Sequence, residues 1–316
     1  MDLLYFFESI RNPVLNAIFQ FITYFGEDVL FLATVLILLW CIDKKRGYYV
    51  LICGFVASLV GQIMKLAFKI DRPWVKDPSF KPVSGAVHAA NDYSFPSGHT
   101  IIVTSTWGAT ALGFGKKLLS IGAPVLIFLV GVSRMYLGVH TPWDVLAGWG
   151  VGIAAVLLLR PLVFRALEKD RLMWGIIFAL VALAAVNLAF AILTEQNGLP
   201  RNPEALQAFL DRMDGTAKNA WTFMGLAVGL IFVYWIDSRV THFDTQAVWW
   251  AQILKVCLGL AVVLVVKSLL KTPLYALTDG HHAADGIRYG LITVIGGGIW
   301  PMTFPFFAKL GKKKAN

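Results

Sequence analysis

The chain has 316 residues, of which 57% are hydrophobic and only 15% carry a charged side chain. A soluble protein of this length cannot bury so much apolar surface, and the mean hydropathy of +0.67 agrees with a chain that crosses a membrane several times. The formal net charge is +9, but the Lys and Arg residues gather in short connections between apolar runs. This pattern indicates membrane topology and argues against nucleic acid as a partner.

The N-terminal residues 1–25 are rich in aromatic side chains but contain Glu8, Arg11 and Asn16, so we expect a helix lying at the membrane interface. Nine apolar runs of spanning or nearly spanning length follow. We therefore predict an all-α, polytopic membrane bundle with eight or nine spans. The runs cover residues 27–42, 48–68, 100–115, 118–137, 145–164, 173–194, 220–236, 248–270 and 288–308.

The basic connections of the chain alternate with longer polar ones. Lys44 to Arg46, Lys116 and Lys117, the segment 160–171 and the C-terminal lysines are the basic ones. The positive-inside rule places them in the cytoplasm. The long segments 69–99 and 195–219 then face the extracytoplasmic side of the cell membrane, together with the three polar motifs described next.

The first motif is KLAFKIDRP, from Lys65 to Pro73, at the outer end of an apolar run. Arg72 follows Lys65 by seven residues, slightly less than two helical turns, so both cations can lie on one helical face and converge on one anion. We expect Pro73 to end this helix. Two cations that snorkel to the interface from a helix end are the alternative interpretation.

The second motif is PSGH, from Pro96 to His99, directly before an apolar run. Ser97 and Gly98 thus fall where the amides at a helix N-terminus are free, and such amides bind phosphate oxygens. The Ser97 hydroxyl adds a donor, and His99 is placed to act as a general acid on a leaving oxygen. A helix cap with an incidental histidine is the alternative.

The third motif is SRMYLGVHTPWD, from Ser133 to Asp144. If Thr141 to Asp144 open the next span, the Asp144 carboxylate accepts a hydrogen bond from one ring nitrogen of His140 and leaves the other nitrogen free to attack phosphorus. Arg134 supplies a third cation near this histidine. An interfacial histidine followed by an aspartate helix cap is the alternative, which the nearby arginine disfavours.

Together the three motifs resemble the signature of the type 2 phosphatidic acid phosphatase superfamily. That signature is a lysine, six residues and Arg-Pro, then Pro-Ser-Gly-His, then Ser-Arg, five residues, a histidine, three residues and an aspartate. The matching residues here are Lys65, Arg72, Pro73, Pro96, Ser97, Gly98, His99, Ser133, Arg134, His140 and Asp144. The resemblance covers about residues 26–165.

The resemblance implies a six-helix phosphatase core over residues 26–168, followed by additional transmembrane helices over residues 169–316. It implies a metal-independent phosphatase with no cofactor, in which His140 is the nucleophile, Asp144 orients it and His99 is the general acid. The expected phosphate ligands are Lys65, Arg72, Ser97, Gly98 and Arg134. The expected substrate is a lipid phosphate or diphosphate such as undecaprenyl diphosphate, phosphatidylglycerol phosphate or phosphatidic acid.

Other functions stay open at this stage. A phosphotransferase passes the same phosphoryl group to a hydroxyl acceptor instead of water. A glucose-6-phosphatase-like enzyme is disfavoured by Asp144, because the matching position in that group is not acidic. The motifs also resemble those of vanadium haloperoxidases, but the apolar composition argues against such soluble helical bundles. A non-catalytic lipid transporter is less favoured, because no motif position has decayed. The motifs do not identify the headgroup, the lipid tail or the oligomeric state.

Several polar residues outside the motifs have no assigned role. The segment 74–95 forms either a substrate rim, with Trp74, Lys76, Lys81 and His88 near a headgroup, or an ordinary solvated loop. In the C-terminal half, structural pairing is favoured over a second phosphate or headgroup site. The residues concerned there are Lys255, Lys267, Lys271, His281 and His282. We expect the three cysteines, Cys41, Cys53 and Cys257, to be buried structural thiols.

Overall fold

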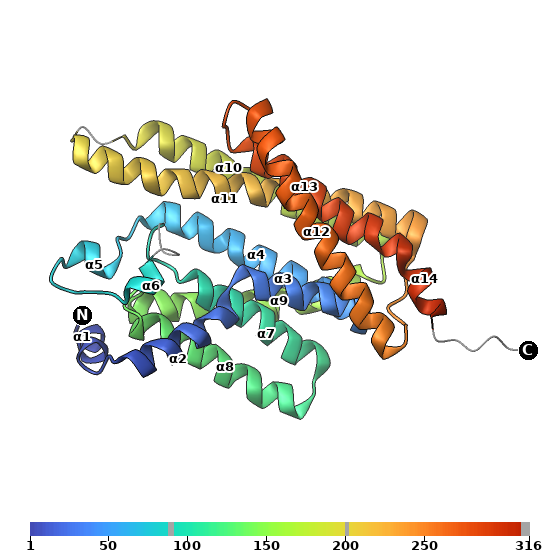
Figure 1. Cartoon of the computed structure of the whole chain (residues 1–316), viewed down its shortest axis with the longest axis horizontal. Helices are drawn as coiled ribbons and strands as arrows, with labels where there is room; N and C mark the ends of the chain where they lie inside the picture. The colour runs from blue at the N-terminus through green and yellow to red at the C-terminus, as the bar shows by residue number, and fades with distance from the viewer. Residues whose placement is uncertain (88–91, 200–201, 311–316) are drawn as a thin grey trace, which may run out of the picture. The chain divides into compact units, whose positions relative to one another are not determined.

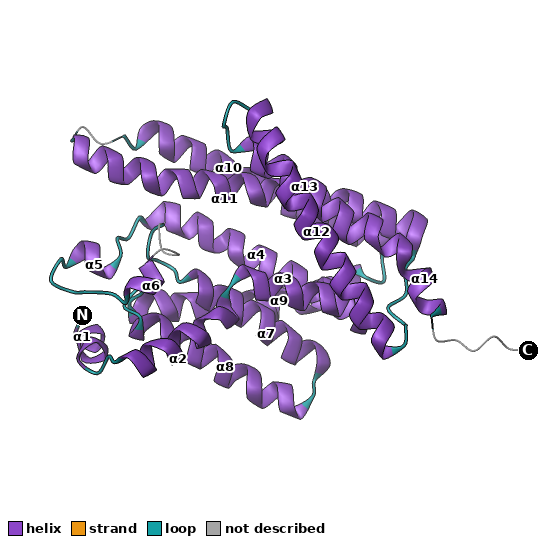
Figure 2. Ribbon diagram, viewed as in Figure 1, coloured by secondary structure: helices purple, strands orange, loops and turns teal. Residues whose placement is uncertain are grey.

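The computed structural model of the protein describes residues 1–87, 92–199 and 202–310. In these ranges every regular element is a helix, which confirms the all-α prediction (Figures 1 and 2). The chain forms two compact units. The first contains residues 1–35, 48–164 and 190–216, and the second contains residues 36–47 and 165–189 and the chain from residue 217 onward. The division at residues 25 and 168 stays a prediction.

The helices follow one another with short connections. They are α1 (Asp2–Ser9), α2 (Pro13–Thr23), α3 (Asp28–Ile37), α4 (Lys44–Phe68), α5 (Pro73–Lys76), α6 (Ser84–Val87), α7 (Gly98–Phe114), α8 (Lys117–Tyr136), α9 (Pro142–Ala166), α10 (Asp170–Asn197), α11 (Pro203–Ile236), α12 (Trp249–Leu277), α13 (Ala283–Val294) and α14 (Phe304–Lys309). Five-residue π-helical turns extend three of these helices, at Leu38–Ile42, Asp237–Thr241 and Ile295–Ile299. Short 3₁₀ turns lie at Tyr24–Gly26 and Trp300–Thr303.

Seven helical segments of the described ranges are long and apolar enough to cross a membrane, and there are eight if one bent pair counts as a span. Two of the nine predicted runs therefore do not stand as long single helices. The run 27–42 is joined to α2 at a 49° bend. The run 100–115 becomes α7, which has only 17 residues because it begins after Ser97 and ends at Gly115 in a left-handed conformation. At about 1.5 Å per residue, α7 falls just short of a typical span.

Residues 1–25 form two helices and not the single one that we expected. The chain breaks after α1, and Asn12 then caps α2, because its side chain accepts a hydrogen bond from the amide of Leu15 and Pro13 occupies the first helical position. Whether this segment lies at the membrane interface stays a prediction.

The helices α7, α8 and α9 hold two of the three motifs at one end of the first unit. The turn at Gly115 makes α7 and α8 antiparallel, so the start of α7 and the end of α8 lie at the end away from Lys116 (Figure 1). Helix α9 packs closely against α7, since a Cβ on Gly148 would lie 3.0 Å from the Ser97 carbonyl oxygen. This close approach places the second and third motifs side by side.

The N-terminal helix α2 fixes the end of α8, directly after the third-motif arginine. The ring of Phe19 stacks on that of Tyr136 with centroids 4.1 Å apart, and the Tyr136 hydroxyl donates to Asn16 across 2.9 Å. The guanidinium of Arg11 donates to the Tyr136 carbonyl oxygen, at 2.9 Å from Nη2. The N-terminal segment thus braces the end of the bundle at which the motifs meet.

In the second unit, the polar residues without an assigned role have protein partners. The Lys255 ammonium donates to the carbonyl oxygen of Trp40 across 2.6 Å and lies 4.3 Å from the centre of the Phe304 ring. Asp285 accepts hydrogen bonds from Arg288 and Tyr275, each across 2.5 Å. These contacts favour structural pairing over a second phosphate site.

The neighbouring groups follow the same pattern. Nδ1 of His282 lies 3.5 Å from Oδ2 of Asp285. Nδ1 of His281 accepts a hydrogen bond from the amide of Ala283 across 3.0 Å. The Lys267 ammonium lies 5.8 Å from the centre of the Tyr289 ring.

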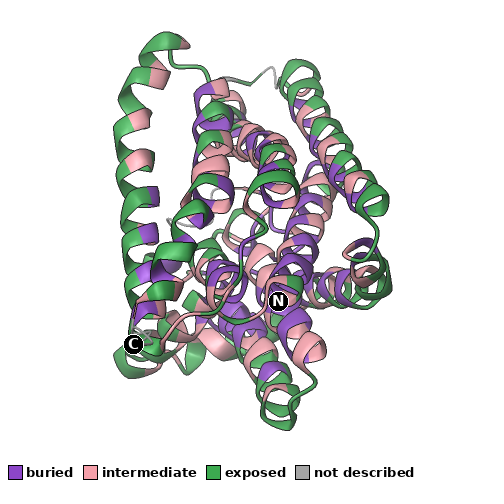
Figure 3. Cartoon of the chain, turned by 90° about the vertical axis from the view of Figure 1, so that its right-hand side faces the viewer, coloured by how far each residue is buried: buried purple, intermediate pink, exposed green. Residues whose placement is uncertain are grey.

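Exposed residues, shown in green in Figure 3, run along the outer faces of many helices. The long helix α12 buries few side chains, which is typical of a helix whose remaining surface faces lipid. Cys257, on this helix, is exposed and Cys41 is partly buried, so the prediction of three buried thiols is wrong except for Cys53.

Candidate active site

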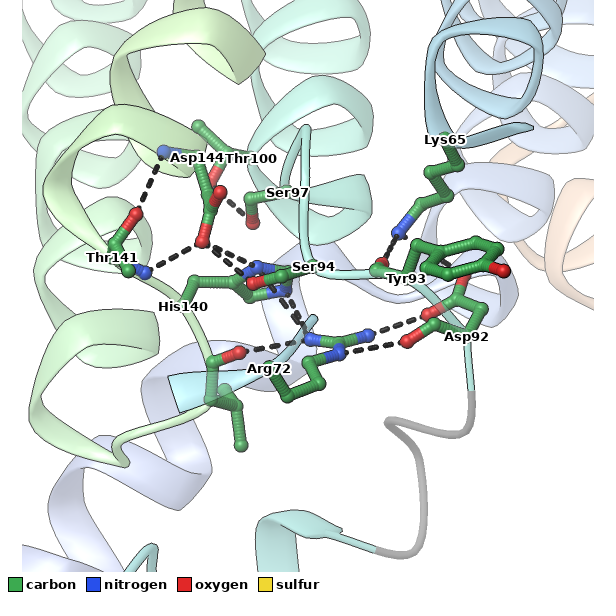
Figure 4. Close-up of polar contacts among 11 residues, drawn as sticks. Lys65, Arg72, Asp92, Tyr93, Ser94, Ser97, Thr100, His140, Thr141 and Asp144 are labelled. Atoms are coloured by element: carbon green, nitrogen blue, oxygen red, sulfur yellow. Dashed lines mark hydrogen bonds and ion pairs between the residues drawn. The ribbon is translucent and has the colours of Figure 1, made fainter. Parts of the chain in front are cut away.

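Residues from all three motifs meet at one place in the first unit (Figure 4). Among the described residues of this unit, four charged side chains are buried: Lys65, Arg72, Arg134 and Asp144. His140 is buried beside them, with 2% of its surface exposed. Burying three cations with one carboxylate is costly unless a further anion neutralises them, so the site is suited to an anionic ligand.

His140 follows α8 and is held between a cation and a carboxylate. Its Nε2 accepts a hydrogen bond from Arg72 Nη1 at 2.9 Å, and its Nδ1 lies 3.6 Å from Asp144 Oδ2. This geometry assigns the ring proton to Nδ1 and leaves the Nε2 lone pair directed into the site. Burial and the neighbouring Arg72 lower the pKa of His140, so the imidazole is neutral at neutral pH, as a nucleophile must be.

The Asp144 carboxylate is oriented by the start of α9. Thr141 and Asp144 form a capping box, in which the Thr141 amide donates to Asp144 Oδ2 across 2.7 Å and the Asp144 amide donates to Thr141 Oγ1 across 3.3 Å. Ser94 Oγ donates to the same carboxylate oxygen across 2.7 Å. Sequence reasoning missed Ser94, although it lies only two residues before the PSGH motif.

The structure corrects the expected position of Arg72. Helix α4 ends at Phe68, and the next residue, Lys69, has a positive φ of 48°, so Arg72 does not share a helix with Lys65. Pro73 does not end α4 but begins α5, at the first helical position that proline favours. Arg72 therefore reaches the site from an extended segment, and its Nη1 also donates to the Val139 carbonyl oxygen across 2.9 Å.

Lys65 lies on the last turn of α4 and points into the same site. Its ammonium donates to the Tyr93 carbonyl oxygen across 2.6 Å and lies 3.1 Å from Asp92 Oδ2. The other oxygen of Asp92 accepts from Arg72 Nη2 across 2.5 Å. Burial alone would raise the pKa of Asp92, but the positive charges of Lys65 and Arg72 outweigh this effect and lower the pKa to about 2. Sequence reasoning also missed Asp92, because it matches no motif position.

The remaining charged phosphate ligand predicted from the sequence is Arg134, and the remaining predicted catalytic residue is His99. Arg134 Nη1 donates to Thr23 Oγ1 across 2.8 Å, whereas its buried Nε has no hydrogen-bond partner among the described residues. The His99 ring lies within electrostatic range of Arg134 and His140. Gly26 permits a close approach here, since a Cβ at this position would lie 2.8 Å from the His99 carbonyl oxygen. The unpaired Nε fits an anion not contributed by the protein.

The two small residues of PSGH differ in what they leave free. The Ser97 amide donates to the backbone carbonyl oxygen of Asp144 across 3.0 Å, so the prediction that this amide is free is wrong. The Ser97 hydroxyl accepts from Thr100 across 2.9 Å. A Cβ built on Gly98, in contrast, would meet no atom within 4 Å. The open space beside Gly98, at the start of α7, suits a phosphate oxygen.

The segment 74–95 lies beside this cluster. The ring of Trp74 is 6.0 Å from the Arg72 guanidinium, and Lys81 contacts Arg11 through its carbonyl oxygen. His88 lies outside the described residues. On the first turns of α11, Arg212 pairs with Asp71 across 2.5 Å and stands 5.5 Å from the centre of the Tyr93 ring. Sequence reasoning found no ligand in the segment of Arg212, and these contacts depend on the fold.

Comparison with known proteins identifies the family. Residues 46–168 match the model of the PAP2 superfamily, and residues 221–313 match the model described as the PAP2 superfamily phosphatase transmembrane extension. The phosphatidylglycerophosphatase B of Bacillus subtilis is 32% identical over 162 residues, which are 48% of this chain and 76% of that protein. The chain belongs to the PAP2 superfamily. It is therefore a phosphatase and a multi-pass membrane protein.

Other relatives of this PAP2 chain have different names. The undecaprenyl-diphosphatase of Sulfolobus acidocaldarius is 33% identical over 144 residues, which are 44% of this chain and 66% of that protein. A probable sphingosine-1-phosphate phosphatase of Dictyostelium discoideum is 29% identical over 201 residues, which are 57% of this chain and 47% of that protein. No solved structure matches the chain significantly. The PAP2 relatives thus share the core of this chain but differ in substrate.

Proposed function

We propose that this PAP2 protein hydrolyses the phosphate or diphosphate of a membrane lipid through a phosphohistidine formed on His140. The observation that carries the proposal is the buried arrangement around Nε2 of this histidine. Arg72 approaches Nε2 from one side at 2.9 Å, and Asp144 stands behind Nδ1 at 3.6 Å. A neutral imidazole oriented by a carboxylate and facing buried cations is equipped to attack phosphorus.

The reaction we propose has two displacements. In the first, His140 Nε2 forms a bond to phosphorus while the bond from phosphorus to the leaving oxygen breaks, and His99 gives that oxygen a proton. In the second, His99 takes a proton from water, the water oxygen attacks the phosphohistidine, and the bond from phosphorus to Nε2 breaks to release orthophosphate. Asp144 stabilises the positive imidazole between the two steps.

The fixed positive charge of the site serves the transition state. Lys65, Arg72 and Arg134 are positioned to hold the equatorial phosphoryl oxygens, and the open space beside Gly98 lies at a helix N-terminus. This set supplies the charge that magnesium provides in other phosphoryl-transfer sites. We therefore expect full activity in EDTA and inhibition by vanadate, which resembles the five-coordinate phosphorus.

The proposed substrates are undecaprenyl diphosphate, phosphatidylglycerol phosphate and phosphatidic acid. The names of the relatives include an undecaprenyl-diphosphatase and a phosphatidylglycerophosphatase, which supports a lipid with a terminal phosphate. The positive-inside pattern supports a site on the extracytoplasmic side of the cell membrane, which is part of the proposal. The expected partners are the lipid phosphate substrate and membrane lipids, and no nucleic acid.

A phosphate-release panel on the full-length protein in detergent tests this function. The panel contains prenyl diphosphate, phosphatidic acid, phosphatidylglycerol phosphate, sphingoid phosphate and glucose 6-phosphate, with His140→Ala as the blank. We expect orthophosphate from at least one lipid and none from glucose 6-phosphate. Release from glucose 6-phosphate alone, or transfer to an added hydroxyl acceptor without free orthophosphate, would overturn the proposal. Strong inhibition by EDTA would contradict the metal-independent mechanism.

A further inference from the structure

The carboxylate of Asp92 fills the space between two cations that the proposed reaction needs. Asp92 lies beside Arg72 in Figure 4, and one of its carboxylate oxygens pairs with each of the two cations, Lys65 and Arg72. The distances are 3.1 Å to the Lys65 ammonium and 2.5 Å to Arg72 Nη2. The same guanidinium reaches His140 Nε2 through Nη1. An anion in this position therefore stands next to the nucleophile and holds the ligands of a phosphoryl group.

The charges of the site set Asp92 and a phosphate dianion in competition for the same cations. Lys65, Arg72 and Arg134 are buried with Asp144 as the buried carboxylate, which leaves two positive charges to be balanced. A phosphate dianion carries that charge. If Asp92 stayed in place as well, a carboxylate and a phosphate would face each other in a poorly hydrated site, where repulsion between like charges is strong.

The side chain of Asp92 is free to leave while its backbone stays in place. It is 24% exposed, whereas the side chains of Lys65 and Arg72 are each 6% exposed. The Asp92 carbonyl oxygen accepts from Arg72 Nε across 2.9 Å, and the amide of Ser94 donates to the Ile70 carbonyl oxygen across 2.7 Å. These two backbone contacts do not involve the carboxylate, so the side-chain torsions can change while both are kept.

We propose that Asp92 is a specificity-determining residue. Its carboxylate occupies the phosphate subsite and prevents monoanionic phosphodiesters from binding there, whereas phosphomonoesters and diphosphates displace it. This inference rests on the proposed function. Phosphodiester headgroups surround a site at a membrane surface, and each carries one negative charge. A tethered carboxylate of equal charge has a high effective concentration and excludes them. A dianion gains a second unit of attraction to the same cations and displaces the carboxylate.

The test measures anion binding to Asp92→Asn and Asp92→Ala. Orthophosphate binding is followed by calorimetry on the full-length protein in detergent, and inhibition of turnover is followed with a soluble phosphodiester, dihexanoyl phosphatidylglycerol. The matched control is Asp279→Asn, which removes one negative charge from an exposed residue of the second unit, at a positive φ of 50° that asparagine tolerates. Thermal unfolding without ligand shows that each variant is folded.

We expect both Asp92 variants to bind orthophosphate about tenfold more tightly than wild type, because one charge-assisted contact commonly carries that much affinity. The phosphodiester should inhibit them at about tenfold lower concentration by the same argument. The Asp279 variant should match wild type in both measurements. Weaker orthophosphate binding in both folded variants would show that Asp92 permanently supports Lys65 and Arg72, which would overturn the proposal. Unchanged inhibition by the phosphodiester would refute the proposed selection against phosphodiesters.

Failure of this inference and failure of the proposed function give different results. Calorimetry reports the competition between Asp92 and orthophosphate without turnover. If no lipid phosphate is hydrolysed, the proposed function is wrong, and so is the substrate selection by Asp92 that rests on it. If lipids are hydrolysed and the Asp92 variants bind anions as wild type does, only the role of Asp92 is wrong.

Discussion

Arg72 donates a hydrogen bond through Nη1 to Nε2 of His140 across 2.9 Å, so a side chain proposed to bind phosphate contacts the nitrogen proposed as nucleophile. The same guanidinium bridges to Asp92 through Nη2. When a phosphoryl group binds, we expect its oxygens to take these donors and to leave Nε2 free to face phosphorus. In the proposed mechanism, Arg72 therefore couples ligand binding to release of the nucleophile.

This coupling predicts that Arg72→Lys is not a conservative change. A lysine ammonium lacks the planar fork with which Arg72 contacts His140 and Asp92 together. We expect kcat/KM for the best lipid substrate to fall about a hundredfold, since lost transition-state contacts of this kind commonly cost two orders of magnitude. The phosphate-release assay measures this fall in kcat/KM. The control is Arg239→Lys, which changes an arginine in an exposed ion pair of the second unit. Activity within twofold of wild type would argue against the bridge.

The carboxylate behind His140 should control the rate without being essential. In Asp144→Asn the amide no longer stabilises the imidazolium, and we expect kcat to fall by about 10²- to 10⁴-fold with weak residual activity. Ser94→Ala removes only one donor to that carboxylate and should cost about tenfold or less. Single-turnover kinetics separate the two effects from substrate binding. A Ser94 variant more damaged than the Asp144 variant would reverse the assigned roles.

The low pKa of His140 makes a prediction about stability and pH. The folded protein keeps this imidazole neutral because of burial and Arg72, whereas the unfolded chain binds a proton below about pH 6.5. Stability from this residue is therefore present above pH 6.5 and is lost as the pH falls, by up to about 2 kcal/mol at pH 5. Thermal unfolding in detergent at pH 7.5 and pH 5 measures the loss.

The matched variant for that experiment is His140→Gln, which keeps a polar side chain but does not titrate. Its unfolding temperature should fall less between the two pH values than that of wild type. An equal or larger fall in the variant would mean that the buried imidazole is protonated in the folded protein.

The motif residues and their convergence were predictable from the sequence, because three ordered patterns fix Lys65, Arg134 and His140 near apolar helix ends. The path of Arg72 was not, because a left-handed residue ends α4 four positions after Lys65. Spacing along an ideal helix cannot report where the helix stops. The upper count of nine spans is not reached among the described residues, partly because α7 is cut short by the turns at its two ends.

Asp92 and Ser94 were missed because their roles come from contacts between segments far apart in the chain. Ser94 meets Asp144 across 50 positions, and Asp92 meets Lys65 only when the loop before PSGH folds back over α4. Arg212 is the clearest case, since it contacts Asp71 from 141 positions away. A polar side chain in a loop gives no periodic signal, so only the fold reveals such partners.

Arg212 pairs with Asp71 from a segment that lies outside the residues matching either PAP2 model. It braces Asp71, the neighbour of Arg72, and the ring of Tyr93, the neighbour of Asp92. We expect Arg212→Ala to raise KM by about threefold with little change in kcat, since partly exposed ion pairs contribute little. Steady-state kinetics check this split. A fall in kcat with KM unchanged would instead place Arg212 in the chemical step.

The central claim is that a covalent phosphohistidine forms on His140, and rapid-quench trapping tests it most directly. The full-length protein is mixed with ³²P-labelled lipid phosphate, quenched in alkali within milliseconds and analysed for protein-bound label. We expect an alkali-stable, acid-labile label in wild type, mapped to the peptide containing His140 and absent from His140→Asn. Steady hydrolysis by wild type without any such label at any quench time, or label retained in His140→Asn, would contradict the mechanism.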